Sequence, residues 1–103
     1  MTALDALVHC RAGDKGGDSL LVVVPWSAED LPALVGVLTT DRLAEHFGGM
    51  SSSDVSVAEV PGLGALVVTL RGRLGGGVTR ATGIDPHGKT LSGHLLTLEV
   101  PWT

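Results

Sequence analysis

Apolar and polar residues alternate at the start of the chain. Residues 4–11 place apolar side chains at even positions and mostly polar ones at odd positions. This period of two is typical of a strand with one face on the core. Residues 19–24 form an uninterrupted β-rich run that ends at Pro25, and such a run predicts a central strand covered on both faces. The segment between the two strands is expected to be a connecting loop.

Helical spacing appears next. Residues 31–38 carry apolar side chains on one helical face, and Pro32 fits only within a first turn. A second short helix is expected over residues 41–47, where Thr39 can act as a cap. Gly48 stands where a helix-ending glycine belongs. These signals predict two consecutive helices.

The second half of the chain is richer in strands. Residues 55–60 and 65–72 predict a hairpin, and a further edge strand is expected within residues 75–84. A helix is predicted over residues 89–96, and residues 99–103 are expected to be extended. The order contains no βαβ repeat. It predicts an α+β sandwich, with one mainly antiparallel sheet of four or five strands and helices on one face.

Composition narrows the class of protein. The chain has 103 residues, of which 44% are hydrophobic and 17% charged, so residues 1–103 are expected to form a single globular domain. A net charge of −4 argues against nucleic acid as a partner. No apolar stretch is long enough for a membrane span, and no signal peptide is visible. The lone Cys10 excludes an intrachain disulfide and favours a cytoplasmic location.

Cations gather around two glycine-rich segments. Arg11 and Lys15 lie in the first, and a second segment, residues 75–77, is flanked by arginines. Glycine backbones can bring N–H groups close to an anion, which arginine and lysine would also attract. The alternative is that these residues form ordinary turns with solvated charges. The candidate anion-binding residues are Arg11, Gly13, Asp14, Lys15, Gly16, Asp18, Gly75, Gly76, Gly77, Thr79 and Arg80.

Other chemistry has little support. The first segment is not a nucleotide-type phosphate loop, because Lys15 precedes Gly16 and a strand follows. Cys10 alternates with core positions and is expected to be a structural thiol. His46 is expected to be a cation at the end of a helix. Since no metal-ligand spacing, triad or dinucleotide fingerprint is present, no catalytic residue is assigned and no metal or cofactor is expected.

Four motifs occur in the order found in one known family. Residues 11–18, Arg-Ala-Gly-Asp-Lys-Gly-Gly-Asp, are followed by a β-rich run, and residues 63–66 read Leu-Gly-Ala-Leu. Residues 74–78 read Leu-Gly-Gly-Gly-Val, and residues 85–91 read Asp-Pro-His-Gly-Lys-Thr-Leu. Together they resemble the small C-terminal domain of the acyclic terpene utilisation (AtuA) family over nearly the whole chain. Ala12, Gly17 and Leu20 stand where the family motif has Ser, an Asn-like residue and Asn.

The resemblance implies a ferredoxin-like fold and a function. The chain is expected to be an accessory domain or small subunit of an AtuA-type protein that degrades branched acyl compounds, as CoA thioesters. Its partner would be the large AtuA-type N-terminal domain, encoded separately. The alternative is a non-catalytic homo-oligomeric module, and a homo-oligomer is expected because apolar residues occur on both faces of the strands. A self-sufficient enzyme is the least favoured class.

Overall fold

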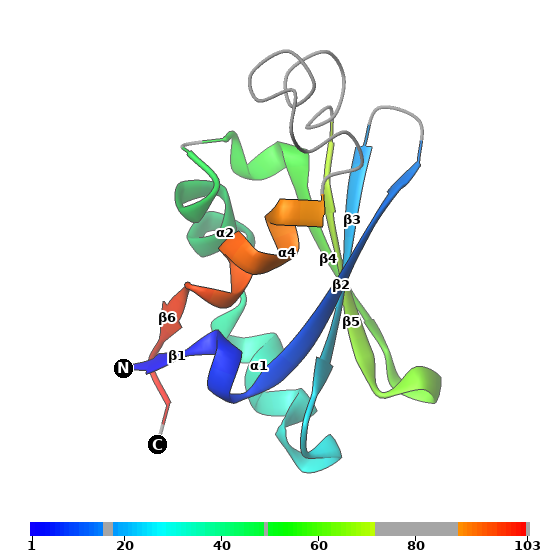
Figure 1. Ribbon diagram of the computed structural model, residues 1–103, viewed down its shortest axis with the longest axis vertical. Coiled ribbons are helices and arrows are strands. Elements are labelled where there is room, and N and C mark those ends of the chain that lie inside the picture. The colour runs from blue at the N-terminus through cyan, green and yellow to red at the C-terminus, as the bar shows by residue number, and fades with distance from the viewer. Residues whose placement is uncertain (16–17, 49, 72–88, 103) are drawn as a thin grey trace.

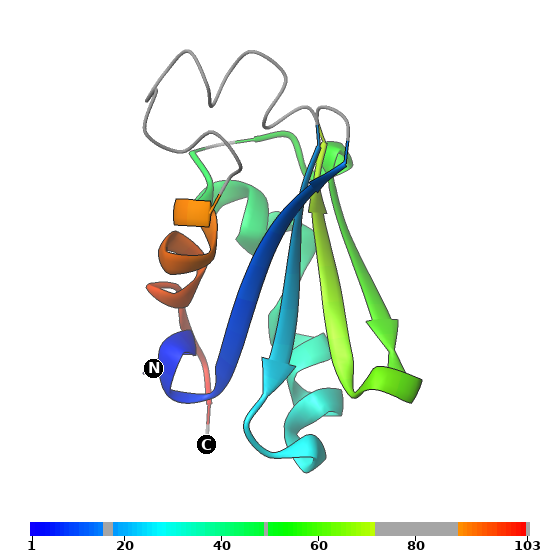
Figure 2. The same cartoon turned by 45° about the vertical axis from the view of Figure 1, so that its right-hand side comes forward.

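Four antiparallel strands build the main sheet, in the order β2-β3-β5-β4. The computed structural model describes residues 1–15, 18–48, 50–71 and 89–102. It places the sheet in one layer and the helices in a second layer on one side (Figures 1 and 2). This arrangement confirms the predicted α+β class. The strands are β2 (Val8–Lys15), β3 (Asp18–Pro25), β4 (Val55–Val60) and β5 (Ala65–Leu70).

The first hairpin is longer than the sequence suggested. Strand β2 continues through Lys15, which pairs with Asp18, so residues 12–15 belong to a strand rather than to a loop. The expectation of a connecting loop from residue 12 to residue 18 is therefore wrong. The physical reason is that ladder hydrogen bonds come from the backbone, which a glycine or a charged residue also supplies. Only residues 16 and 17, which lie outside the described part, separate the two strands.

The second hairpin agrees with the prediction. Strands β4 and β5 pair in antiparallel register, from Val55 opposite Leu70 to Val60 opposite Ala65. A 3-10 helix begins the connection, and Gly64 follows with φ +62°, a conformation that favours glycine. Strand β5 ends at Leu70 rather than at residue 72. The edge strand expected within residues 75–84 lies outside the described residues.

The helices follow the local signals. After a 3-10 turn, helix α1 (Leu31–Val37) carries its proline in the first turn. Helix α2 (Thr40–His46) is capped by Thr39, whose Oγ1 accepts a hydrogen bond from the Arg42 N–H at 3.2 Å. Gly48 follows with φ +87°, as its predicted role requires. Helix α4 (Lys89–Leu96) lies where a helix was expected.

The two ends of the chain meet in a small second sheet. Strand β1 (Thr2–Ala3) pairs antiparallel with β6 (Glu99–Val100). Between β1 and β2, Leu4–Ala6 forms a 3-10 helix, so the prediction of a strand beginning at residue 4 is wrong. The Leu4 N–H donates to the Leu98 carbonyl at 2.8 Å. This contact with the other end of the chain holds the segment away from the main sheet.

The core lies between one face of the sheet, the inner face, and the helices. In β3 every second residue is buried and the others are half-buried. The expectation that β3 is covered on both faces is therefore wrong. The buried residues contributed by the sheet and the helices include Leu21, Val23, Leu66, Val68, Leu70, Leu34, Leu43, Phe47 and Leu95.

The opposite side of the sheet is the outer face. Strand alternation and the pairing register assign its residues, because neighbouring side chains along a strand point to opposite sides. The described helices all lie on the other side (Figure 2). The outer-face residues are His9, Arg11, Gly13, Leu20, Val22, Val24, Ser56, Ala58, Val60, Ala65, Val67 and Thr69.

Candidate functional site

The candidate anion-binding residues fall into two groups. Arg11, Gly13, Asp14 and Lys15 lie on β2, and Asp18 begins β3. The others lie outside the described residues; they are Gly16, Gly75, Gly76, Gly77, Thr79 and Arg80. The geometry of the site is therefore built from the strand ends that stand next to the two glycine-rich segments in the sequence.

Four charged residues form a row across one end of the sheet. Lys15 pairs with Asp18, and the next positions on β5 and before β4 are Arg71 and Asp54. The Arg71 N–H donates to the Asp54 carbonyl at 2.8 Å, which continues the ladder by one step. We call these four residues the charged row. Residue 15 precedes the first glycine pair and residue 71 precedes the second glycine-rich segment, so the chain leaves this end of the sheet in the direction of both segments.

Arg71 is the cation whose contacts the structure describes best in the charged row. Its side chain is exposed, and Nη1 donates to the Ser53 carbonyl at 3.2 Å. This bond uses one of the five guanidinium N–H donors, so the others can contact an anion or a carboxylate. Sequence reasoning noted this arginine beside the second glycine-rich segment but did not include it in the site.

Arg11 stands apart from that end. It lies opposite Val22 in the middle of the sheet, and its side chain is exposed on the outer face. Four residue steps along β2 separate it from Lys15, a distance of roughly 13 Å at the usual strand rise. The cations of the first segment are thus spread along a strand and not gathered in a loop.

Cys10 behaves as the structural thiol that was expected. It is half-buried and packs against the hydrophobic core. Burial raises the pKa of its thiol to about 12, because desolvation penalises the charged thiolate. A nucleophilic cysteine requires a stabilised thiolate, so this environment argues against a catalytic role.

Two histidines from distant parts of the sequence form a reciprocal pair. His46 Nε2 donates to the His94 carbonyl, and His94 Nε2 donates to the His46 carbonyl, both at 2.8 Å. The imidazole rings stack with centroids 4.3 Å apart and an interplanar angle of 15°. The pair joins the end of α2 to α4. His46 lies in the last turn of α2, as predicted, but its contact with His94 was not foreseen.

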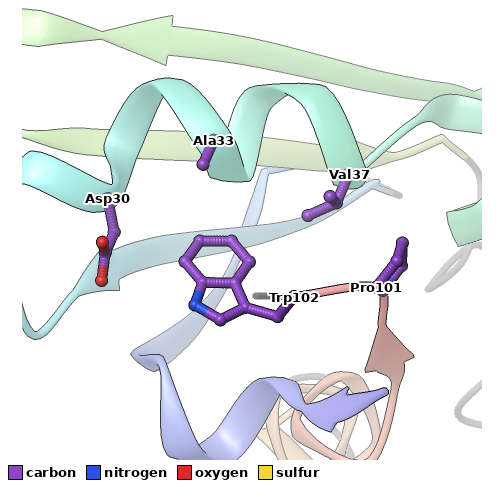
Figure 3. Close-up of a pocket in the computed structure, with 5 residues that line it drawn as sticks. All are labelled: Asp30, Ala33, Val37, Pro101 and Trp102. Atoms are coloured by element: carbon purple, nitrogen blue, oxygen red, sulfur yellow. The ribbon is translucent and has the colours of Figure 1, made fainter.

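Two shallow pockets lie beside the helices. One, of about 320 Å3, is lined by Asp30, Ala33, Val37, Pro101 and Trp102. Figure 3 shows the Trp102 indole beneath α1, with Ala33 and Val37 on the helix above the indole and Asp30 just before the start of the helix. The other, of about 390 Å3, is lined by Arg42, Glu45, His46 and Leu98.

The first pocket holds no arrangement that suggests catalysis. Its lining consists of the Asp30 carboxylate, the Trp102 indole and aliphatic side chains, and these residues do not include a nucleophile beside a base. Within the described ranges, no three His, Cys, Asp or Glu side chains stand close enough together to hold a metal ion. Among the same residues, no helix is long and apolar enough to cross a membrane.

Comparison with known proteins identifies the family. The sequence matches the family model of the AtuA ferredoxin-like domain over residues 2–101. No curated protein and no solved structure gives a match. The matched region contains both hairpins, the charged row and all three described α-helices. The chain therefore belongs to the AtuA ferredoxin-like domain family.

Proposed function

We propose that the chain is an accessory domain or small subunit that works with a large AtuA-type protein. In this role it contributes to the breakdown of acyclic terpenes and related branched acyl compounds, handled as CoA thioesters. Its own task is to hold an anionic group of the substrate, a phosphate or a carboxylate. The chemical step belongs to the larger partner, which is expected to be encoded separately.

One observation carries the anion-binding part of the proposal. The register puts Lys15 and Arg71 in one row, at the end of the sheet from which the chain continues toward the two glycine-rich segments. The chain is acidic overall, and this row holds two of its seven lysine and arginine residues. Arginine suits phosphate and carboxylate groups because its planar fork can donate two parallel hydrogen bonds. Arg11 is left out because of its distance from this end.

Calorimetric titration tests this task directly. CoA and a short branched carboxylic acid are titrated into the wild type and into the Lys15→Ala and Arg71→Ala variants. A charge-assisted hydrogen bond contributes about 1.5–3 kcal/mol, so each variant should bind roughly ten- to a hundredfold more weakly. The matched control is Arg42→Ala, which removes a cation from α2 and should leave binding unchanged.

Two results would contradict the anion site. The first is the absence of any binding heat with the wild type. The second is an equal loss of affinity in the Arg42→Ala control, which would indicate a general effect of net charge. The partner is tested separately by purifying the tagged chain from its native host and identifying what accompanies it. Recovery of a large AtuA-type protein supports the subunit role.

A second candidate is a non-catalytic homo-oligomeric module. It is favoured by the outer face, where Val22 and Val67 stand side by side without a covering helix in the described part of the chain. This candidate predicts self-association without anion binding. The titration and a mass measurement on the same sample distinguish it from the first.

A further inference from the structure

The outer face presents a continuous apolar surface. Its centre is formed by β3 and β5, where Val22 pairs with Val67, and Leu20 and Val24 extend it along β3. These four side chains are half-buried by their neighbours in the sheet. In the described part of the chain the helices all lie on the other side (Figure 2). Apolar patches of this kind on soluble proteins mark interaction sites.

The size of the face suits a modest interface. Four strands about 4.8 Å apart and about six residues long cover on the order of 400 Å2 in projection. A stable interface usually buries about 800 Å2 on each partner. The sheet alone therefore fits a weak, concentration-dependent association, unless side chains at its ends enlarge the contact.

Two large apolar side chains extend the face at one end. Trp26 is 68% exposed and Leu63 is 75% exposed. Val23 pairs with Leu66 in antiparallel β3 and β5. Trp26 follows Val23 by three residues and Leu63 precedes Leu66 by three, so both stand at the same end of the sheet. The Trp26 ring contacts His9, an outer-face residue, with centroids 4.7 Å apart. Such exposed aromatic and aliphatic groups are typical anchors of protein interfaces.

The charged row occupies the opposite end. Across the sheet its members are Lys15, Asp18, Arg71 and Asp54, so positive and negative residues alternate. An alternating row of four is complementary to its own reverse. When the row of one copy faces the row of a second copy in reversed order, each cation stands opposite a carboxylate.

We propose that the outer face binds the same face of a second copy of this chain. The twofold axis runs parallel to the strands, so that β2 of one copy lies over β4 of the other and β3 lies over β5. This symmetry reverses the charged row, as complementarity requires, and brings Trp26 of each copy over Leu63 of the other. The product is an eight-stranded β-sandwich of the aligned type. Self-complementary apolar and charged surfaces are what a twofold interface requires.

The symmetry argues for a second copy over an unrelated partner. Three separate features, the Val22–Val67 centre, the alternating row and the two exposed anchors, are satisfied by one operation. Arg11 stays at the rim because β2 is an edge strand, where its guanidinium keeps contact with water. The inference shares Lys15 and Arg71 with the proposed anion site, but its apolar centre does not. Val22 and Val67 take no part in anion binding, so the loss of self-association in Val22→Glu tests the dimer separately from the proposed function.

Sedimentation and light scattering across the micromolar concentration range test the proposal. The wild type should approach the mass of two chains as concentration rises. Val22→Glu places a carboxylate at the centre of the interface and should be monomeric throughout. The matched control is Val35→Glu, at a position on α1 that is 38% exposed and lies away from the outer face, and it should associate like the wild type. Circular dichroism confirms that each variant is folded.

Charge variants in the charged row keep the test decisive if Val22→Glu fails to fold. Lys15→Glu with Arg71→Glu makes the row entirely negative, and Asp18→Lys with Asp54→Lys makes it entirely positive. Each variant alone should be monomeric, and an equal mixture should form the heterodimer. If the charged residues formed ion pairs only within one chain, mixing the two variants would not restore dimerisation.

Several outcomes would overturn the proposal. They are a wild type that keeps the mass of one chain at every concentration, a Val22→Glu variant that still dimerises, and single-sign rows that self-associate as well as the wild type does. A monomeric wild type whose outer face binds the large AtuA-type protein would also overturn it, and would assign the face to that partner.

Discussion

The His46–His94 pair allows a prediction that can be worked out in numbers. Replacing either histidine with alanine removes the hydrogen bond from its Nε2 to the carbonyl of the other and also removes the shared ring stack. A typical net hydrogen bond contributes about 1 kcal/mol and an aromatic pair about 1 kcal/mol more. Each single variant should therefore lower the free energy of unfolding by about 2 kcal/mol.

The double variant separates the two contributions. Each imidazole donates to the backbone of the other residue, so the hydrogen bonds are lost independently, while the stack can be lost only once. The expected cost of His46→Ala with His94→Ala is about 3 kcal/mol, and the coupling energy between the two sites is about 1 kcal/mol. Unfolding in urea at one fixed pH measures the free energy of unfolding of all four proteins.

The control and the refuting result are both clear. Glu45→Ala, on the same helix, changes an exposed side chain and should alter the free energy of unfolding by less than about 0.5 kcal/mol. If the two histidine substitutions add within about 0.3 kcal/mol, the rings do not interact and the reasoning is wrong.

Two further predictions concern buried groups on neighbouring strands. Ser19 is fully buried, and its Oγ has no hydrogen-bond partner among the described residues. Ser19→Ala removes this uncompensated polar group and should raise the urea midpoint, with a gain of about 1 kcal/mol in the free energy of unfolding. A clear loss of stability would instead reveal that the hydroxyl is hydrogen-bonded. For Cys10, the pKa in the folded chain, about 12, lies above the ordinary value of 9.0, so its contribution to stability is complete below pH 9 and is lost as the pH rises toward 12. Above pH 9 the melting temperature of the wild type should therefore fall relative to that of Cys10→Ala. If the melting temperatures of the two proteins instead run parallel with pH, the assigned burial of the thiol is contradicted.

Local signals in the sequence were enough to place most of the elements. The cap at Thr39 and the left-handed glycine at Gly48 were predicted because each depends only on its immediate neighbours. The hairpin at residues 55–70 was predicted because alternation and turn residues occur together. These interactions are short in sequence, so a single sequence contains all the information they need.

The errors arose where distant contacts decide the structure. Leu4 resembled a strand residue by alternation, but its N–H is held by Leu98 from the other end of the chain. Residues 12–15 resembled a loop by composition, yet they complete a ladder whose partner strand supplies the hydrogen bonds. The histidine pair joins residues 48 positions apart, and no local pattern announces such a contact.

The meeting of β1 and β6 has a consequence for how this domain can be joined to others. Thr2 faces Val100, so the first and last strands emerge at one point of the surface. Domains whose ends are adjacent tolerate insertion into a loop of a host protein, and they tolerate circular permutation. A polypeptide attached at either end would therefore begin its path from the same place, on the helical side of the molecule (Figure 1). A partner fused at the N-terminus or at the C-terminus would therefore leave the outer face of the sheet accessible to other molecules.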